Sequence, residues 1–254
     1  MDRIYRVKHG MQPRYIVERG GKKYWMRGDV FGEYGVGDEV PAGEALKALS
    51  PVDPSIVVCI GLNYKDHAAE MKKPLPAEPL VFLKPSSSVI GPDDPIRIPA
   101  WAGTIHYESE MAVVIGKRAA RVKEADAMTH VLGLTCLNDV TARELQNKDG
   151  QYSRSKGFDT FCPIGPCIAV GLDPSALDIA GDVNGQQKQK SNTRELIFTV
   201  PYLVAHVTRF MTLNPGDVIT TGTPSGVGPM VPGDHMTITL EGVGKLSNPC
   251  VAEA

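Results

Sequence analysis

The chain lacks the features that would direct it to a membrane. No apolar run approaches the roughly 18 residues that a membrane-spanning helix needs, and the opening residues, MDRIYRVK, contain no apolar stretch of signal-peptide length. We therefore expect a cytoplasmic protein with no membrane partner.

The chain also lacks a surplus of charge of either sign. Its 27 basic and 29 acidic residues leave a net charge of −2. Proteins that bind polyanions do so largely through surplus lysine and arginine, so nothing in the composition predicts nucleic acid as a partner. The expected partner is a small-molecule substrate.

The usual signatures of nucleotide binding are missing as well. The segment 221–228 (TGTPSGVG) is rich in glycine, but it has neither the Gly-Lys-Ser/Thr ending of a phosphate-binding loop nor the spacing of a dinucleotide fingerprint. An NAD-dependent oxidoreductase is therefore disfavoured. Such a loop can still bring backbone N–H groups close to a bound carboxylate.

Cysteine occurs in an odd number and without a Cys-x-x-Cys pair. In a chain with no sign of secretion, this pattern predicts reduced, buried thiols. The five cysteines are Cys59, Cys136, Cys162, Cys167 and Cys250.

The 254 residues, 42% of them hydrophobic, suffice for one large core or for a core with a small appendage. Residues 1–52 are predicted to form a small N-terminal β-rich domain. Within it, the segment 15–26 alternates around a Gly-Gly pair, which is typical of a hairpin, and a short helix is expected over 42–49. A proline-containing linker, 51–54, follows.

Residues 53–254 are predicted to form the second domain. Its apolar segments alternate irregularly with short helices such as 202–211, so a regular βαβ array is not expected. The predicted class is α+β and mainly β. Strands are expected over 56–62, 80–83, 111–115, 131–137 and 236–240.

The most informative feature that is present is a pair of acids, Glu108 and Glu110, beside the apolar run 111–115. Side chains two apart on a strand point to the same face, so the two carboxylates should lie together. Two such anions resist joint ionisation unless a proton or a hard cation intervenes, and Mg²⁺, Mn²⁺ and Ca²⁺ prefer carboxylate oxygens. Taken alone, such a pair is more often an ordinary solvated strand face.

A third acid, Asp139, follows the apolar run 131–137 and precedes a predicted helix. It therefore lies at the carboxyl end of a strand, where ligand sites tend to be built, although a simple helix cap would also explain it.

A second candidate group consists of His67 and Glu70. If Asp66 caps a short helix, residues three apart share one face, and Glu70 can orient the imidazole of His67 and raise its basicity. A histidine held in this way suits general-base catalysis. The alternative is a surface ion pair.

Two cations, Lys156 and Arg143, are candidates for binding a substrate carboxylate and stabilising an enolate, although either could form an exposed ion pair instead. Gln146 lies one helical turn beyond Arg143 and should share its face. Thr223, in the glycine-rich loop, is predicted to bind a substrate carboxylate through its hydroxyl and backbone N–H. The Tyr64 hydroxyl is a further candidate, which ordinary packing would explain equally well.

In their joint order, six segments resemble the fumarylacetoacetate hydrolase family over residues 56–248. The segments are 61–71 (GLNYKDHAAEM), 82–85 (FLKP), 107–110 (YESE), 138–143 (NDVTAR), 156–166 (KGFDTFCPIGP) and 221–228 (TGTPSGVG).

The resemblance implies a rolled mixed β-sheet flanked by short helices and a divalent metal held by Glu108, Glu110 and Asp139. It also implies a lid that carries His67 and Glu70 as the water-activating dyad. Further implications are that Lys156 faces the metal pocket and that the chain forms a homodimer.

One position departs from the family pattern. His106 stands where many members carry an acidic residue, two places before the first expected metal ligand. The departure affects the charge near the metal and bears on the choice of substrate.

These features predict a hydrolase that depends on Mg²⁺ or Mn²⁺, with Ca²⁺ as a further candidate. It would cleave a C–C bond of an acylpyruvate-type 2,4-dioxo acid, such as fumarylpyruvate, through an enolate that the metal stabilises. The alternative is an isomerase or decarboxylase of 2-oxo or 2-hydroxydienoic acids in aromatic catabolism, acting on 5-carboxymethyl-2-hydroxymuconate or oxaloacetate. Hydrolysis is placed first because a His-Glu pair suits the activation of water. A metal-binding protein without activity is disfavoured, since the dyad would then be idle.

Overall fold

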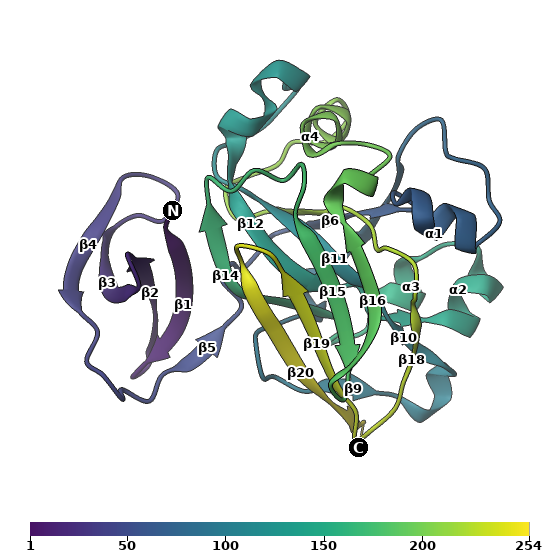
Figure 1. Ribbon diagram of the computed structural model, residues 1–254, viewed down its shortest axis with the longest axis horizontal. Coiled ribbons are helices and arrows are strands. Elements are labelled where there is room, and N and C mark those ends of the chain that lie inside the picture. Colours follow the sequence, from purple (N-terminus) through teal and green to yellow (C-terminus); the bar gives the residue numbers. More distant parts are fainter. Residues whose placement is uncertain (254) are drawn as a thin grey trace.

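The computed structural model describes residues 1–253, in which β-structure dominates, as predicted (Figure 1). The largest sheet in this range is mixed and contains twelve strands: β1 (Arg3–His9), β2 (Gln12–Arg19), β3 (Lys22–Gly28), β4 (Tyr34–Glu39), β5 (Lys47–Leu49), β6 (Val57–Gly61), β7 (Leu80–Lys84), β8 (Val89–Ile90), β11 (Ser109–Ile115), β12 (Val131–Asn138), β14 (Cys162–Val170) and β17 (Val218–Thr220). Ten of them follow the order β4-β3-β2-β1-β14-β12-β11-β17-β6-β7, while β5 pairs with β1 and β8 pairs with β14.

Two smaller sheets complete the β-structure. One has the order β16-β15-β19-β20-β9 and the other β13-β10-β18. Figure 1 shows β15, β19 and β20 layered in front of β11 and β12, and the strands of the two layers contact each other. The strands are β9 (Ile96–Ile98), β10 (Ile105–Tyr107), β13 (Thr141–Ala142), β15 (Asp178–Val183), β16 (Gln186–Asn192), β18 (Gly228–Met230), β19 (His235–Leu240) and β20 (Gly244–Ala252).

The apolar run that forms β11 is buried on both faces. Met111 and Val113 belong to the core cluster shared with the second sheet. Ala112 and Val114 belong to a second cluster that includes Ile4 of β1. A strand covered on both sides reads as a continuous apolar run, and this explains why the sequence signal was clear here.

Helices are short and lie at the margins of the sheets. Three of them, α1 (Lys65–Glu70), α2 (Arg143–Asp149) and α3 (Ser153–Lys156), gather on one side of the molecule (Figure 1). The predicted helix over 202–211 is α4 (Val200–Thr208), which packs against η3 (Glu124–His130). The remaining 3₁₀ turns are η1 (Ser86–Ser88), η2 (Ala100–Ala102) and η4 (Thr193–Glu195).

The predicted N-terminal hairpin is present as β2 and β3. Gly20 and Gly21 form its turn with φ of 60° and 78°, a region that glycine occupies without steric cost. β1 also pairs with β14 at Arg3 and Ile4, which joins this segment to the main sheet. The division of the chain at residue 52 stays a prediction.

The helix expected over 42–49 is wrong. Residues 47–49 form β5, which pairs antiparallel with β1, and no helix is described between 40 and 49. Pro41 and Gly43 shorten the segment available for a helix. The unpaired edge of β1 then offers hydrogen bonds that outweigh a weak local helix propensity.

The expectation for the cysteines is confirmed, since all five are unpaired and buried. Burial raises the pKa of the thiols, to about 12 for Cys162 and Cys167, so they are held as neutral thiols.

Candidate metal centre and active site

The three predicted acids converge where two antiparallel segments meet. Glu110 lies in β11, Glu108 lies in the break between β10 and β11, and Asp139 follows β12. The Asp139 N–H donates to the Glu108 carbonyl over 2.9 Å, and the Glu108 N–H donates to the Asn138 side chain over 3.0 Å. These bonds fix the two ligand-bearing segments against each other.

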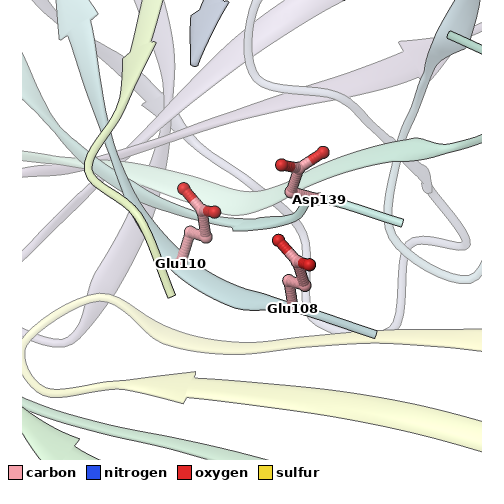
Figure 2. A group of neighbouring side chains, drawn as sticks. All are labelled: Glu108, Glu110 and Asp139. Carbon is pink, nitrogen blue, oxygen red and sulfur yellow. The ribbon is translucent and has the colours of Figure 1, made fainter. Parts of the chain in front are cut away.

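The three side chains of the triad lie next to one another (Figure 2). One oxygen from each of Glu108, Glu110 and Asp139 lies within 4.8 Å of the others, and all three residues are buried. Oxygen donors at this spacing fit a hard divalent cation. The expectation that these residues come together is therefore met in the structure, and their role as metal ligands is a proposal.

Glu108 is paired with two neighbouring cations. It accepts from Lys156 Nζ at 2.9 Å and from Arg143 Nη2 at 2.6 Å. Burial alone would raise the pKa of Glu108, but the charges of Lys156 and Arg143 outweigh that effect and hold the pKa well below its usual range.

Glu110 has the opposite environment. Its Oε2 accepts from the Gly222 N–H at 2.8 Å, so the glycine-rich loop does place a backbone donor on a carboxylate, here one of the protein itself. Burial, followed by the charges of Asp139 and Glu108, raises the pKa of Glu110 well above its ordinary value. An acid in this situation holds a proton or requires a nearby cation, which supports a divalent ion at this centre.

Lys156 is fully engaged within the cluster. Its ammonium donates to Asp139 Oδ2 at 2.6 Å, to Glu108 Oε2 at 2.9 Å and to Thr141 Oγ1 at 2.7 Å. An ammonium has three protons, so this geometry leaves none free for a substrate. Lys156 can act on a substrate through its charge, or by releasing one of these partners.

A cavity of about 510 Å³ opens beside the triad. Its wall includes almost every residue that the sequence singled out, together with apolar side chains from β6, β7 and the segment after α1. The lining residues are Ile60, Gly61, Leu62, His67, Met71, Lys73, Leu80, Phe82, His106, Glu108, Glu110, Asp139, Arg143, Gln146, Asn147, Gly150, Tyr152, Lys156, Thr223 and Val227.

The His67–Glu70 pair is formed on α1. His67 Nδ1 lies 2.9 Å from Glu70 Oε2, and Glu70 Oε1 accepts from the Gly226 N–H at 3.0 Å. The pair is therefore tied to the glycine-rich loop and is not a free surface ion pair. Since Glu70 occupies Nδ1, Nε2 of His67 is the nitrogen left to exchange a proton.

Asp66 does not cap α1, contrary to the prediction. The N-cap is Tyr64, and Asp66 lies in the first helical turn. Its carboxylate accepts from the His67 N–H at 2.7 Å and from Ser191 Oγ at 2.7 Å. The contact with Ser191 joins α1 to β16. A six-residue helix is too short to be stable by itself, so it depends on contacts of this kind.

The predicted substrate-binding residues Arg143, Gln146 and Thr223 differ in the hydrogen bonds that they already make within the protein. Arg143 and Gln146 line the cavity and hydrogen-bond to each other. Thr223 also lines it, but its hydroxyl donates to the Ser109 carbonyl at 3.0 Å and accepts from Gln189 at 2.8 Å. The hydroxyl of Thr223 is therefore already engaged within the protein.

The prediction that Tyr64 contacts the substrate is not supported. Tyr64 is fully buried and is not among the residues that line the cavity. Its position before α1 places the ring inward, in the main core cluster, where packing decides its orientation. The alternative of ordinary packing, left open by the sequence, is the one that the structure favours.

His106 lines the cavity beside Arg143. Burial, followed by the charge of Arg143, lowers the pKa of His106, so the ring is neutral near pH 7. Its Nδ1 is buried and has no hydrogen-bond partner within residues 1–253. This chain therefore has a neutral polar ring beside the cavity.

Sequence reasoning missed Lys84. This residue, at the end of β7, is 1% exposed, and its Nζ donates to Asp139 Oδ1 at 2.7 Å. The signal was present, because a lysine that closes an apolar strand and enters the core must be paired. Lys84 lay inside a segment quoted for the family resemblance, but its side chain received no role.

Comparison with known proteins agrees with this site. Residues 56–251 match the family model described as fumarylacetoacetate (FAA) hydrolase C-terminal. A mitochondrial oxaloacetate tautomerase of Xenopus laevis is 45% identical over 219 residues, which cover 81% of this chain and 69% of that protein.

Two solved structures have nearly the same fold. A 2-hydroxyhepta-2,4-diene-1,7-dioate isomerase from Mycobacterium marinum superposes with a TM-score of 0.92 at 39% identity, covering 100% of both chains. A 5-carboxymethyl-2-hydroxymuconate delta-isomerase from Mycobacterium smegmatis gives 0.91 at 41% identity, covering 99% of this chain and 100% of the other.

No helix in residues 1–253 is long and apolar enough to cross a membrane. The predicted α+β fold, the order of the motifs and the buried acidic triad all agree with the matched family. The chain belongs to the fumarylacetoacetate hydrolase family.

Proposed function

We propose that this protein is a divalent-metal-dependent enzyme that interconverts the keto and enol forms of a short 2-oxo dicarboxylic acid. The observation that carries the proposal is one cavity whose lining contains both a histidine held by a glutamate and a triad of carboxylates. The named relatives, a tautomerase and two isomerases, support this choice over hydrolysis.

The proposed metal ligands are Glu108, Glu110 and Asp139, with Mg²⁺ or Mn²⁺ as the expected ion and Ca²⁺ as an alternative. A bound divalent cation would polarise the 2-oxo group of the substrate, which makes the adjacent C–H more acidic. The raised pKa of Glu110 fits a site that becomes fully ionised only when a cation is present.

The residues of the chain then supply binding and proton transfer. His67 takes the proton from the carbon beside the 2-oxo group through Nε2, while Glu70 holds the ring by Nδ1. Arg143 uses two of its N–H groups on Gln146 and Glu108, so others remain for a substrate carboxylate. Met71 and Leu80 add apolar side chains to the lining of the cavity.

A second carboxylate on the substrate is consistent with the charges along the cavity. Besides Arg143 and Lys156, the wall includes Lys73, which follows α1 and has no ion pair with any carboxylate among the described residues. An unpaired cation at this place favours a dicarboxylate over a monocarboxylate. The relatives are named for oxaloacetate and a heptadiene-1,7-dioate, which carry two carboxylates, and for 5-carboxymethyl-2-hydroxymuconate, which carries three.

C–C hydrolysis of an acylpyruvate is the second candidate, because the same dyad could deprotonate water. The presence of the dyad does not itself select hydrolysis, since removal of a proton from carbon requires a base as well. Decarboxylation of oxaloacetate is a third outcome of the same enolate chemistry.

The test is to assay the purified protein, with Mg²⁺ or Mn²⁺, on oxaloacetate for tautomerisation and decarboxylation, on a hydroxymuconate-type acid for isomerisation and on fumarylpyruvate for cleavage. We expect the highest kcat/KM for tautomerisation or isomerisation, abolished by a chelator. Cleavage of fumarylpyruvate with the highest kcat/KM would reject this assignment in favour of the hydrolase. Activity that survives complete metal removal would reject the metal site.

We further propose a cytoplasmic location and a homodimer. Both follow from the family resemblance and from the composition of the chain.

A further inference from the structure

Lys84 is a buried cation that lies behind the proposed metal centre. It is 1% exposed and does not line the cavity, so it cannot touch a substrate there. Its ammonium has two recorded acceptors, Asp139 Oδ1 at 2.7 Å and the Val140 carbonyl at 3.3 Å. Both belong to the turn that carries the third acid of the triad.

The two oxygens of Asp139 are divided between two lysines. Lys156 holds Oδ2 at 2.6 Å and Lys84 holds Oδ1 at 2.7 Å. Lys156 is shared with Glu108 and Thr141, so it keeps two partners if it leaves Asp139. Lys84 has no other carboxylate within hydrogen-bonding distance in residues 1–253, so Asp139 is its one charged partner there.

Burial of the Lys84 ammonium costs solvation free energy, so packing alone does not explain a lysine at this position. An ammonium taken out of water loses its solvation, and an apolar side chain of similar volume is often at least as stable at such a position. A cation that is nevertheless placed on a metal ligand corresponds to the outer-shell partners that orient ligands in metalloproteins.

We propose that Lys84 is a positioning residue: it fixes Asp139 by Oδ1, so that Oδ2 stays directed toward Glu108 and the metal. The inference rests on the proposed metal site. It assigns to Lys84 no contact with the substrate and no proton transfer.

The test compares Mn²⁺ binding to the wild-type protein and to Lys84→Met, which keeps most of the volume but removes every donor. Free Mn²⁺ is measured by its six-line EPR signal. We expect Lys84→Met to bind Mn²⁺ about 10–100-fold more weakly, the range typical for loss of an outer-shell partner. Lys84→Gln, which keeps a shorter donor, should recover part of the affinity.

Two control variants separate positioning from general damage. Val207→Ala removes buried volume from α4 and should lower the melting temperature while leaving Mn²⁺ affinity unchanged. Lys123→Met removes the same charge from an exposed position and should change neither quantity.

The outcomes distinguish this inference from the proposed function. Wild-type protein that binds no Mn²⁺ overturns the metal site itself. Wild-type binding together with unchanged or tighter binding by Lys84→Met overturns only the role of Lys84. If neither Lys84 variant folds, a crystal structure of the wild-type protein with Mn²⁺ decides, because an ion bound to Asp139 Oδ1 would contradict the proposal.

Discussion

The triad combines an acid whose pKa is lowered with one whose pKa is raised. Glu108 has two cations as neighbours, and its pKa is lowered, whereas Glu110 has two acids as neighbours, and its pKa is raised. Three buried carboxylates thus avoid carrying three full charges before the metal binds. Binding of the metal should therefore release a proton from Glu110.

Glu110 gives a prediction about pH and stability. The pKa of Glu110 is raised in the folded protein, so the unfolded chain loses this proton at a lower pH than the folded protein does. The contribution of Glu110 to the free energy of unfolding therefore falls as pH rises above about 4.3. In a chelating buffer, we expect Glu110→Gln to be more stable than wild type at pH 8, with a difference that shrinks toward pH 4. Thermal denaturation across this range measures it.

The same variant should reverse its rank when metal is added. If the proposed metal site is right, Mg²⁺ or Mn²⁺ should stabilise the wild-type protein and should not stabilise Glu110→Gln, which lacks one of the proposed ligands. A Glu110→Gln protein that keeps metal-dependent activity would remove Glu110 from the proposed ligand set.

The dyad gives a second prediction at this scale. His67→Ala and Glu70→Gln should lower turnover by roughly 10²–10⁴-fold for His67, and by less for Glu70, because the first removes the base and the second only its orientation. Mn²⁺ affinity, measured by EPR, should not change in either variant. Loss of tautomerisation and of cleavage to the same degree would show that one base serves both reactions, and unchanged turnover would exclude the dyad.

At the scale of elements, α1 depends on contacts outside itself. Asp66 accepts from Ser191 of β16, and Glu70 accepts from the N–H of Gly226. These two bonds hold the helix over the cavity in the structure. A helix this short would otherwise unfold at little cost.

Ser191→Ala should loosen this helix. A hydrogen bond to a charged group contributes about 1.5–3 kcal/mol, and its loss here should weaken the placement of α1 over the cavity. We therefore expect KM to rise by about tenfold, with a smaller change in kcat. Hydrogen exchange of residues 65–73 should become faster. Gln187→Ala, at an exposed position on the same strand, is the control and should leave both quantities unchanged.

Strands were easier to predict from sequence than the segments between them. The run that forms β11 is buried on both faces, and its apolar residues identify it without any knowledge of the partners. Residues 42–49 carry no such pattern. Their conformation depends on pairing with β1, which local sequence does not reveal.

At the scale of the whole molecule, the twelve-stranded sheet joins the N-terminal strands to the strands that carry the site. β1 pairs with β14, β14 with β12, and β12 with β11, which bears Glu110. Ile4 of the N-terminal segment also belongs to the same hydrophobic cluster as Ala112 of β11.

The assembly state is the prediction that belongs to this scale. A family homodimer would bury about 2,000 Å² or more, an area typical of obligate pairs. Light scattering at micromolar concentration should give twice the chain mass of 27.4 kDa. A mass equal to that of one chain would contradict the dimer.

The sequence by itself determined the fold class, the positions of the main strands, the three acids and the family. Each depends on residues close together in the chain, where spacing translates directly into a shared face or a strand end. The order of the six motifs also related residues that lie far apart in the chain to one family site.

Only the tertiary structure decided which hydrogen-bonding groups are already paired within the protein and which are available to a ligand. Lys84 reaches Asp139 across 55 residues, and Gly222 reaches Glu110 across 112. The burial of Tyr64 and the hydrogen bond of the Thr223 hydroxyl likewise depend on residues that are distant in the chain. Hydrogen bonding and pKa depend on distance in space and on exclusion of water, and neither quantity is set by neighbours in the chain.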